Sequence, residues 1–185
     1  MKIICIGRNY IDHAKEMNAP VPEKPIYFLK SDICIHRESQ KFFYPEFTND
    51  LHYECELVVK INRLGKHIDT KFAHKYYSHV SLGLDLTARD IQKKCKEKGH
   101  PWEIAKSFDK SAPISGKWIS VKDLSMETLS FELFQNNTLK QKGEIKDMIF
   151  SIDEIISYVS KFMTLKIGDL IFTGTPSGVG PVQIG

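Results

Sequence analysis

The chain has 185 residues, of which 42% are hydrophobic and 26% are charged, a composition that excludes collagen-like and disordered classes. Its 26 Lys and Arg residues against 23 Asp and Glu give a formal charge of only +3, without the concentrated basic stripe of a nucleic-acid-binding protein. No segment approaches the ~20 apolar residues of a membrane span. We therefore expect one domain over residues 1–185, with neither a nucleic-acid nor a membrane partner.

The four cysteines, Cys5, Cys34, Cys55 and Cys95, are widely spaced and form no C-x-x-C pair. Such pairs mark zinc and redox sites, whereas isolated thiols are typical of reduced, buried residues. At this length a core can bury roughly 70% of the unfolded surface, so neither a disulfide nor a structural metal is required. The sequence thus predicts a cytoplasmic protein with free thiols.

The N-terminal part of the chain is predicted to contain short strands and brief helices. Helical turns are expected over 9–17 and 69–77. Three prolines from residue 20 to residue 25 favour an extended backbone over that short stretch. Short apolar runs bounded by turn residues predict strands over 2–6, 26–29, 54–61 and 80–85.

A helix is predicted after the strand over 80–85. Thr87 followed by Asp90 resembles a capping box, with Thr87 as the N-cap, so Asp85 is expected where a strand ends and a helix begins. The densest basic run, over 93–98, falls late in this helix, where cations suit the carbonyl end. We interpret that run as a solvated helix end and assign it no partner.

The C-terminal part is predicted to form a hairpin, a helix and a final strand. Asn136-Asn137 indicates a turn between strands over 129–134 and 138–141. Apolar residues at helical spacing over 151–163 predict the clearest helix, and a strand over 170–173 follows it. Strand outweighs helix without a regular βαβ alternation, which favours an α+β class with a β-rich core.

Glu54 and Glu56 flank Cys55 in the strongest predicted strand. Alternate strand residues share a face, so the two carboxylates point the same way while Cys55 faces the core. A pair of solvated glutamates has the same pattern, and a hard cation such as Mg²⁺ requires a third carboxylate. Asp85 is the candidate third ligand, although a residue at the start of a helix is the plainer interpretation of Asp85 alone.

His13 and Glu16 lie three residues apart in a predicted helix, within hydrogen-bonding reach on one face. Such a pair can act as a base with an orienting carboxylate, but the same spacing is common on surface helices. Lys106 lies in an otherwise apolar setting, where its ammonium must find an anion or extend to solvent. The glycines after Thr173 lack the G-K-[ST] ending of a P-loop, so we expect tight turns near a ligand.

Together these signals resemble the fumarylacetoacetate hydrolase family, and the resemblance covers nearly the whole chain. The matching motifs, in chain order, are Gly7-Arg8-Asn9-Tyr10, His13-Ala14-Lys15-Glu16, Phe28 with Lys30, Glu54-Cys55-Glu56-Leu57, Asp85-Leu86-Thr87-Ala88-Arg89-Asp90 with Gln92, Pro101-Trp102, Lys106-Ser107-Phe108-Asp109, Gly168-Asp169, Thr173-Gly174-Thr175-Pro176 and Gly178-Val179-Gly180. Within the family, the chain is most similar to the small single-domain acylpyruvase and oxaloacetate decarboxylase type.

The resemblance implies a fold, a cofactor and a set of site residues. The fold is a β-rich mixed β-sandwich roll of the family's C-terminal domain type with short flanking helices, usually as a homodimer. The cofactor is Mg²⁺, with Mn²⁺ or Ca²⁺ as substitutes. The implied residues are the metal ligands Glu54, Glu56 and Asp85, the catalytic residues His13, Glu16 and Lys106, with the dyad on a mobile lid, and the substrate-binding residues Arg8, Lys30, Gln92 and Thr175.

The implied function is Mg²⁺-dependent chemistry on a small 2-oxo acid. It comprises hydrolysis of the C–C bond of acylpyruvates, decarboxylation of oxaloacetate, or both, through a metal-bound pyruvate enolate. Two alternatives stay open: isomerisation, hydration or decarboxylation of hydroxylated dienedioates such as 2-hydroxyhepta-2,4-diene-1,7-dioate, and a non-catalytic module that binds a metal and a 2-oxo acid. The family's last strands, which follow the Gly178-Val179-Gly180 turn, are expected to be missing from this sequence.

Overall fold

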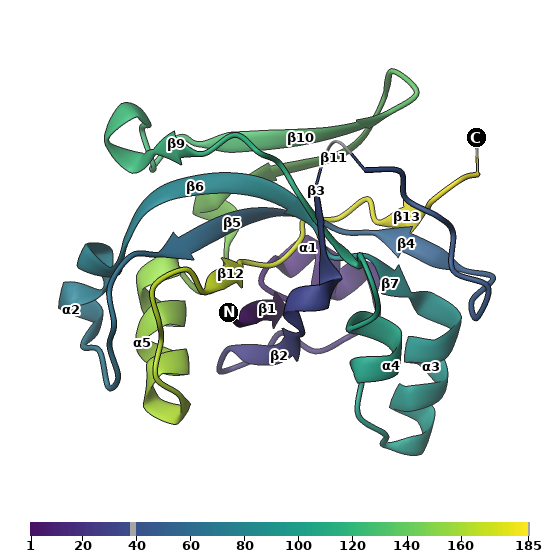
Figure 1. The fold of residues 1–185 in the computed structure, drawn as a ribbon, viewed down its shortest axis with the longest axis horizontal. Coiled ribbons are helices and arrows are strands. Elements are labelled where there is room, and N and C mark those ends of the chain that lie inside the picture. The colour runs from purple at the N-terminus through teal and green to yellow at the C-terminus, as the bar shows by residue number, and fades with distance from the viewer. Residues whose placement is uncertain (38–39, 185) are drawn as a thin grey trace.

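A computed structural model describes residues 1–37 and 40–184 of the chain. Within these residues the strands form three sheets, of eight, three and two strands, and short helices flank them (Figure 1). The expected β-rich α+β fold is confirmed. Gly185 lies outside the described residues.

The largest sheet is mixed and curled. Its order is β2-β1-β12-β5-β6-β8-β3, with β9 paired to β6 beside that path. The strand bounds, in this order, are β2 Ile26–Lys30, β1 Ile3–Gly7, β12 Leu170–Phe172, β5 Cys55–Ile61, β6 Tyr77–Leu84, β8 Ala112–Ile114, β3 Ile35–Arg37 and β9 Ile119–Ser120. The sheet thus places strands from both ends of the described chain side by side, because β1 pairs with β12 in parallel.

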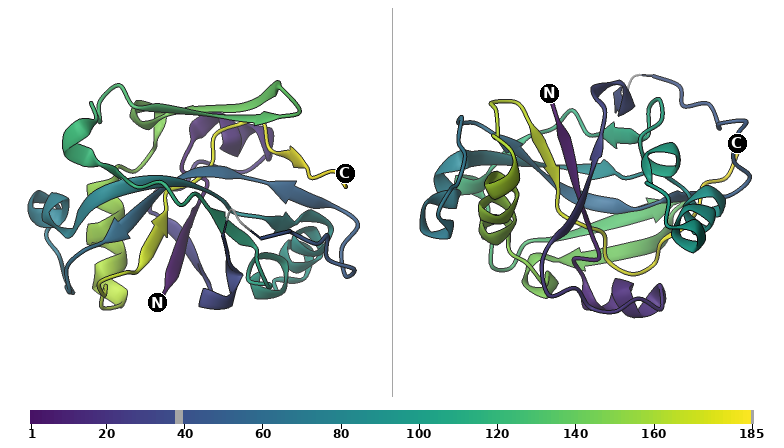
Figure 2. Two further views of the ribbon diagram at one scale, coloured as in Figure 1. Left: turned by 45° about the horizontal axis from the view of Figure 1, so that its top comes forward. Right: turned by 90° about the horizontal axis from the view of Figure 1, so that it is seen from below.

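Two smaller sheets complete the architecture. Strands β10 (Ser130–Gln135) and β11 (Thr138–Glu144) form an antiparallel hairpin that lies across the curved β5 and β6 (Figures 1 and 2). Its turn residues, Asn136 and Asn137, both have positive φ, as the expected tight turn requires. Strands β13 (Gly180–Pro181), β4 (Leu51–Tyr53) and β7 (Thr87–Ala88) form the third sheet.

The α-helices are short and lie at the margins of the sheets (Figures 1 and 2). Their bounds are α1 Ile11–Glu16, α2 Thr70–Ala73, α3 Arg89–Lys98, α4 Glu103–Lys106 and α5 Ile152–Phe162. In the described part of the chain, no helix is long and apolar enough to cross a membrane.

Helix α5 shows how local sequence fixes an element and its packing. Ser151 is the N-cap, and it forms a capping box with Glu154, which satisfies backbone N–H groups that the first turn leaves free. The apolar face of α5, including Ile155 and Ile156, is fully buried in the main core with side chains from β1, β5 and β12. The predicted helix over 151–163 is therefore confirmed, one residue shorter at each end.

The capping box predicted for α3 is wrong. Its N-cap is Ala88, whose methyl group cannot accept a hydrogen bond from the first turn, and Thr87 belongs to β7. The Thr87 hydroxyl instead donates to the Asp85 carbonyl and accepts a hydrogen bond from Lys106. The Asp90 carboxylate accepts from the Thr48 hydroxyl. Tertiary partners have therefore taken both side chains that the local pattern assigned to a cap.

Candidate metal centre and active site

Three buried carboxylates meet where β5 begins and β6 ends. Glu54 directly precedes β5, Glu56 is its second residue, and Asp85 directly follows β6. Cys55 pairs with Leu84, and the Asp85 N–H donates to the Glu54 carbonyl at 2.8 Å, so the strand register brings the carboxylates together. One oxygen of each lies within 4.8 Å of one oxygen of the other two.

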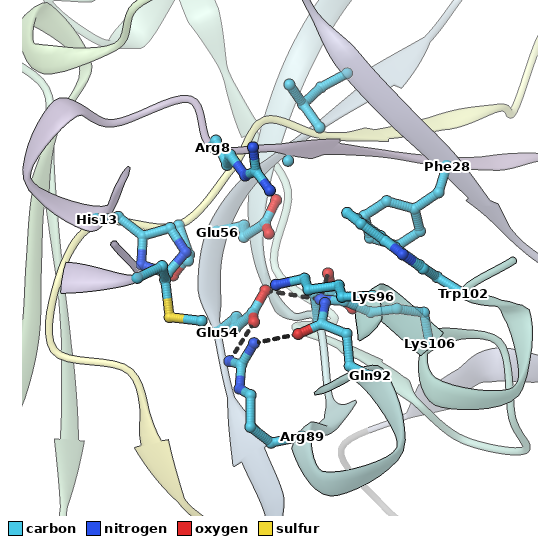
Figure 3. Close-up of a pocket in the computed structure, with 15 residues that line it drawn as sticks. Arg8, His13, Phe28, Glu54, Glu56, Arg89, Gln92, Lys96, Trp102 and Lys106 are labelled. Carbon is cyan, nitrogen blue, oxygen red and sulfur yellow. Dashed lines mark hydrogen bonds and ion pairs between the residues drawn. The ribbon is translucent and has the colours of Figure 1, made fainter. Parts of the chain in front are cut away.

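The side chain between the two glutamates confirms the strand alternation. Cys55 is buried among the apolar residues of the main core, and Glu56 points into the opposite, polar cavity with Glu54 (Figure 3). All four cysteines are free and buried, as expected.

Glu54 and Glu56 differ in their charge environment. Burial alone would raise the pKa of Glu54, but the charges of Lys106 and Arg89 outweigh it and hold the pKa well below its usual value. Burial raises the pKa of Glu56 well above its usual value, and the negative charges of Asp85 and Glu54 raise it further. In the E-x-E pair, nearby positive side chains thus balance the negative charge of Glu54 but not that of Glu56.

Lys106, at the end of α4, is the main internal counter-ion. Its ammonium donates to Glu54 Oε2 at 2.9 Å, to Asp85 Oδ2 at 2.7 Å and to the Thr87 hydroxyl at 2.6 Å. The first of the two outcomes expected for this lysine, an anionic partner, is therefore confirmed. Burial would lower the pKa of Lys106, but the charges of Asp85 and Glu54 raise it above its usual value.

Arg89 is a second counter-ion, which the sequence reasoning did not assign to the site. Its guanidinium donates to Glu54 Oε1 at 2.6 Å and to Gln92 Oε1 at 2.7 Å (Figure 3). It opens α3, one turn before Gln92, so both side chains project from the same face. The structure therefore places Gln92 at the cavity, held by Arg89.

The structure places Lys30 behind the site and not in the cavity. Its side chain is fully buried, and its ammonium lies 2.9 Å from Asp85 Oδ1. It also donates to the Leu86, Lys106 and Ser111 carbonyls and to the Ser111 hydroxyl. With so many internal acceptors, its ammonium fixes Asp85 and the end of α4 from behind, and a contact between Lys30 and substrate stays a prediction.

The predicted dyad is present on α1. His13 Nδ1 lies 3.1 Å from Glu16 Oε2, and the largely buried His13 ring lines the cavity opposite α3 (Figure 3). The other Glu16 oxygen accepts the Gly178 N–H at 3.0 Å. Glu16 therefore connects the histidine to the glycine-rich segment, and movement of α1 as a lid stays a prediction.

Two glycines of the glycine-rich segment, Gly174 and Gly178, have positive φ, as expected for a segment that relies on glycine. Gly174 has φ of +101°, and a Cβ there would lie 2.6 Å from Asn9 Cβ, so only glycine fits this position. The Gly174 N–H donates to Glu56 Oε2 at 2.6 Å. The Thr175 hydroxyl donates to the Cys55 carbonyl and accepts from Gln141. Backbone that passes this close to β5 thus supplies Glu56 with a donor.

The rest of the cavity lining includes Arg8, which was expected there, and residues that the sequence reasoning did not assign to the site. Arg8, expected there, lines the cavity with a positive φ of 58°, which is uncommon for a residue with a side chain. Lys96, from the basic run to which no partner was assigned, lines it too, and Phe28 and Trp102 form an aromatic wall with ring centroids 6.0 Å apart. Of the ten expected site residues, eight line the cavity, and the other two, Glu16 and Lys30, lie behind it and contact lining residues.

The triad has the donor set of a divalent cation site. Hard cations such as Mg²⁺, Mn²⁺ and Ca²⁺ bind carboxylate oxygens, and three lie here within 4.8 Å of one another. Asp85 Oδ1 accepts no hydrogen bond from any described residue, although the Lys30 ammonium lies 2.9 Å away. Within residues 1–37 and 40–184 no lysine, arginine or histidine forms an ion pair with Glu56, so the buried residues present fit a bound divalent cation.

The chain was compared with known sequences. The family description "Fumarylacetoacetate (FAA) hydrolase C-terminal" matches residues 2–184. The chain belongs to the fumarylacetoacetate hydrolase family. It is 45% identical over 181 residues to the bovine protein named oxaloacetate tautomerase FAHD1, mitochondrial, covering 98% of this chain and 82% of the relative. It is 40% identical over 186 residues to oxaloacetate tautomerase YcgM of Escherichia coli, covering 100% of this chain and 84% of the relative.

A solved structure of this family has the same architecture. Fumarylpyruvate hydrolase from Pseudomonas aeruginosa, solved in complex with Mn²⁺ and pyruvate, superimposes with a TM-score of 0.92 at 37% identity, covering 99% of this chain and 81% of that one. These relatives are enzymes, and one of them binds a divalent metal. The family resemblance inferred from the motifs is confirmed. Relatives occur in mitochondria and in bacteria.

Proposed function

We propose that this chain is a divalent-cation-dependent enzyme that acts on oxaloacetate through its enolate, interconverting the enol and keto forms and releasing CO₂ as a second outcome. The observation that carries the proposal is the buried triad, in which Lys106 and Arg89 pair with Glu54 while no described residue forms an ion pair with Glu56. The bovine and E. coli relatives named oxaloacetate tautomerases support the substrate.

The metal ligands in this proposal are Glu54, Glu56 and Asp85. Bound there, Mg²⁺ or Mn²⁺ supplies a Lewis acid that polarises the 2-oxo group of the substrate. Lys30 keeps Asp85 oriented from behind, and Lys106 holds both Asp85 and Glu54 through its ammonium. The cavity is therefore ordered before substrate arrives, which reduces the reorganisation that the reaction requires.

His13 moves the proton in this proposal. Its ring lines the cavity, and Glu16, which is hydrogen-bonded to Nδ1, fixes the tautomer and stabilises the imidazolium. His13 takes a proton from C3 of keto-oxaloacetate and returns it to the 2-oxygen, giving the enol. When the C3–C4 bond breaks instead, CO₂ leaves, and protonation of the remaining enolate at C3 gives pyruvate. Lys106 and Arg89 stabilise the negative charge that develops in both reactions.

Hydrolysis of acylpyruvates is the second candidate, favoured by the His13–Glu16 pair. With Nδ1 held by Glu16, the imidazole Nε2 takes a proton from water, which then attacks the distal carbonyl, and C–C cleavage leaves the same enolate beside Lys106. The hydrolase from P. aeruginosa supports this reaction.

The test follows enol loss, CO₂ release and pyruvate release from oxaloacetate and acetylpyruvate, with Mg²⁺, with Mn²⁺ and with excess chelator. His13→Ala should lower each turnover by ~10²-fold or more while the metal affinity, measured by calorimetry, stays within about threefold. His79→Ala, an exposed histidine outside the cavity, is the matched control. Turnover by chelated His13→Ala protein would refute the assignment, and reaction only with a dienedioate would favour the isomerase alternative.

We also propose a homodimer and a cytoplasmic location for this chain. Sedimentation of the purified protein tests the first, and fractionation of the source cells tests the second. A monomer at micromolar concentration, or recovery in an organelle, would contradict them.

A further inference from the structure

One lysine of helix α3 differs from its neighbours. Lys93, Lys94, Lys96 and Lys98 all lie on this helix and are exposed at its surface. Of these four, Lys96 alone lines the cavity of the metal centre. Positions 89, 92 and 96 recur at i, i+3 and i+7 and share one helix face, so Lys96 extends the row that Arg89 and Gln92 begin.

Aromatic side chains determine where the Lys96 ammonium lies. It sits over the indole of Trp102, 5.5 Å from the ring centroid. Trp102 packs near Phe28, and the Lys106 ammonium lies over the Phe28 ring at 5.0 Å. Two ammonium groups thus lie along one aromatic wall of the same cavity, that of Lys106 from α4 and that of Lys96 from α3 (Figure 3).

The two ammonium groups differ in their partners. Lys106 forms ion pairs with Glu54 and Asp85. The Lys96 ammonium forms no ion pair or side-chain hydrogen bond with any residue between 1 and 37 or 40 and 184, and its closest ring contact is with Trp102. Burial lowers its pKa, and the positive charges of Arg89 and Arg8 lower it further. The Glu54 charge acts in the opposite direction, but that carboxylate is already paired with Arg89 and Lys106. Among the described residues, positive charge therefore converges on this part of the cavity without a carboxylate paired to Lys96.

We propose that Lys96 is a specificity-determining residue that binds the second carboxylate of the substrate, the one remote from the 2-oxo group. An anion there would relieve the repulsion among Lys96, Arg89 and Arg8. The site then selects dianionic 2-oxo acids over monoanionic ones of similar length. This inference rests on the proposed function, because it requires that the first carboxylate and the 2-oxo group face the triad.

The experiment measures binding to the Mg²⁺-loaded protein by calorimetry, with two probes. One is 3,3-difluorooxaloacetate, a dianion without a proton on C3, and the other is pyruvate, a monoanion. Lys96→Met should weaken binding of the dianion by ~10–100-fold, as expected for a lost charged hydrogen bond, and binding of pyruvate by less than about threefold. Lys96→Arg should recover most of the difference, and Lys94→Met, exposed on the same helix, should reproduce the parent protein.

Each other outcome has a definite meaning. Equal weakening of both probes, or no change for either, overturns the role of Lys96 while leaving the proposed function intact. Failure of the parent protein to bind either probe in Mg²⁺ refutes the proposed function and the inference with it. The thermal midpoint of each variant checks folding, and Lys96→Gln replaces Lys96→Met if the latter unfolds. The ratio of kcat/KM for oxaloacetate to that for acetylpyruvate should fall in parallel with the binding ratio.

Discussion

Buried carboxylates occur in two regions of this chain, and their surroundings differ. Asp169, just before β12, accepts hydrogen bonds from the backbone N–H groups of Lys2 and Lys166, both at 2.8 Å, and pairs with the Lys2 ammonium. Burial would raise its pKa, but the hydrogen bonds from Lys2 and Lys166 and the charge of Lys2 lower it. Both oxygens of Asp169 are therefore satisfied within the protein.

The carboxylates at the ends of β5 and β6 are only partly satisfied. Lys106 and Arg89 compensate Glu54, whereas the one hydrogen bond to Glu56 comes, among the described residues, from the Gly174 N–H. The difference shows how to separate structural from functional carboxylates in a buried setting. Where the fold supplies all the donors, the group holds the chain together, and where negative charge exceeds the supply, the fold leaves room for a cation.

The largest effect is expected from Glu56→Gln, which removes the carboxylate that no positive side chain of the described residues pairs with. The variant should bind Mg²⁺ at least ~100-fold more weakly, because removing a ligand costs more than removing an outer partner of one, and its turnover of oxaloacetate should fall in step. Calorimetry and the enol assay measure the two quantities. Glu132→Gln, exposed on β10, is the control.

The same variant also tests the comparison without metal. Glu56→Gln relieves repulsion among buried carboxylates, so the metal-free variant should have a higher thermal midpoint than the metal-free parent. Saturating Mg²⁺ should reverse that order, because only the parent gains stability from tight binding. If Glu56→Gln destabilises the metal-free protein, the triad is an ordinary structural cluster and the contrast with Asp169 fails.

Lys106→Met should have the next largest effect. It leaves Glu54 and Asp85 with less positive charge beside them, so turnover should fall by ~10²–10³-fold through loss of charge stabilisation. Metal affinity should be kept or increased, because the triad becomes more negative. Titration with Mn²⁺ and single-turnover kinetics separate these effects. Loss of metal binding together with turnover would instead mean that Lys106 only holds the triad in shape. The control is Lys98→Met, at an exposed position at the end of α3.

Asp169→Asn should have a smaller effect, confined to stability. At neutral pH it should lose about 1.5–3 kcal/mol of unfolding free energy, the range for hydrogen bonds to a charged group, with no change in metal affinity. The pKa of Asp169 in the native protein lies below its ordinary value of 3.8. Its contribution is therefore complete above pH 3.8 and is lost as the pH falls through the lower native value.

Denaturant unfolding at pH 7 and near pH 2.5 measures this difference. The parent and Asp169→Asn should differ at pH 7 and converge at the acid pH, and Asp12→Asn, exposed on α1, should not show the pattern. A gap that is independent of pH would mean that the amide disturbs packing and that charge has no part in it.

Local periodicity was enough to predict the parts of the site carried by single elements. The alternation of a strand places Glu54 and Glu56 on one face, and the turn of a helix places His13 beside Glu16, whatever the rest of the fold does. Most longer strands and α5 follow from the same patterns. Strands of two or three residues, such as β4 and β9, were missed because their pairing depends on neighbours far away in sequence.

The remaining site residues depend on packing between distant segments. Nothing near Lys30 in sequence reveals that four acceptors from residues 86 to 111 surround its ammonium. Likewise, Lys96 looks like any lysine at a helix end until Trp102 is placed beside it. The incorrect cap at Thr87 has the same cause, because Lys106 and the Asp85 carbonyl occupy its hydroxyl. Family resemblance supplied some of these positions, but not their partners.

The pairing of β1 with β12 also has a consequence for biosynthesis. Ile3 lies opposite Leu170, and Gly174 supplies the backbone donor to Glu56. A ribosome therefore releases the first strand and its neighbour β2 long before the parallel neighbour β12 exists, and the acidic centre stays open until the glycine-rich segment emerges. Such long-range closure slows folding and lengthens exposure of apolar strands. Nascent chains halted before residue 170 should consequently depend on chaperones, and full-length chains should not.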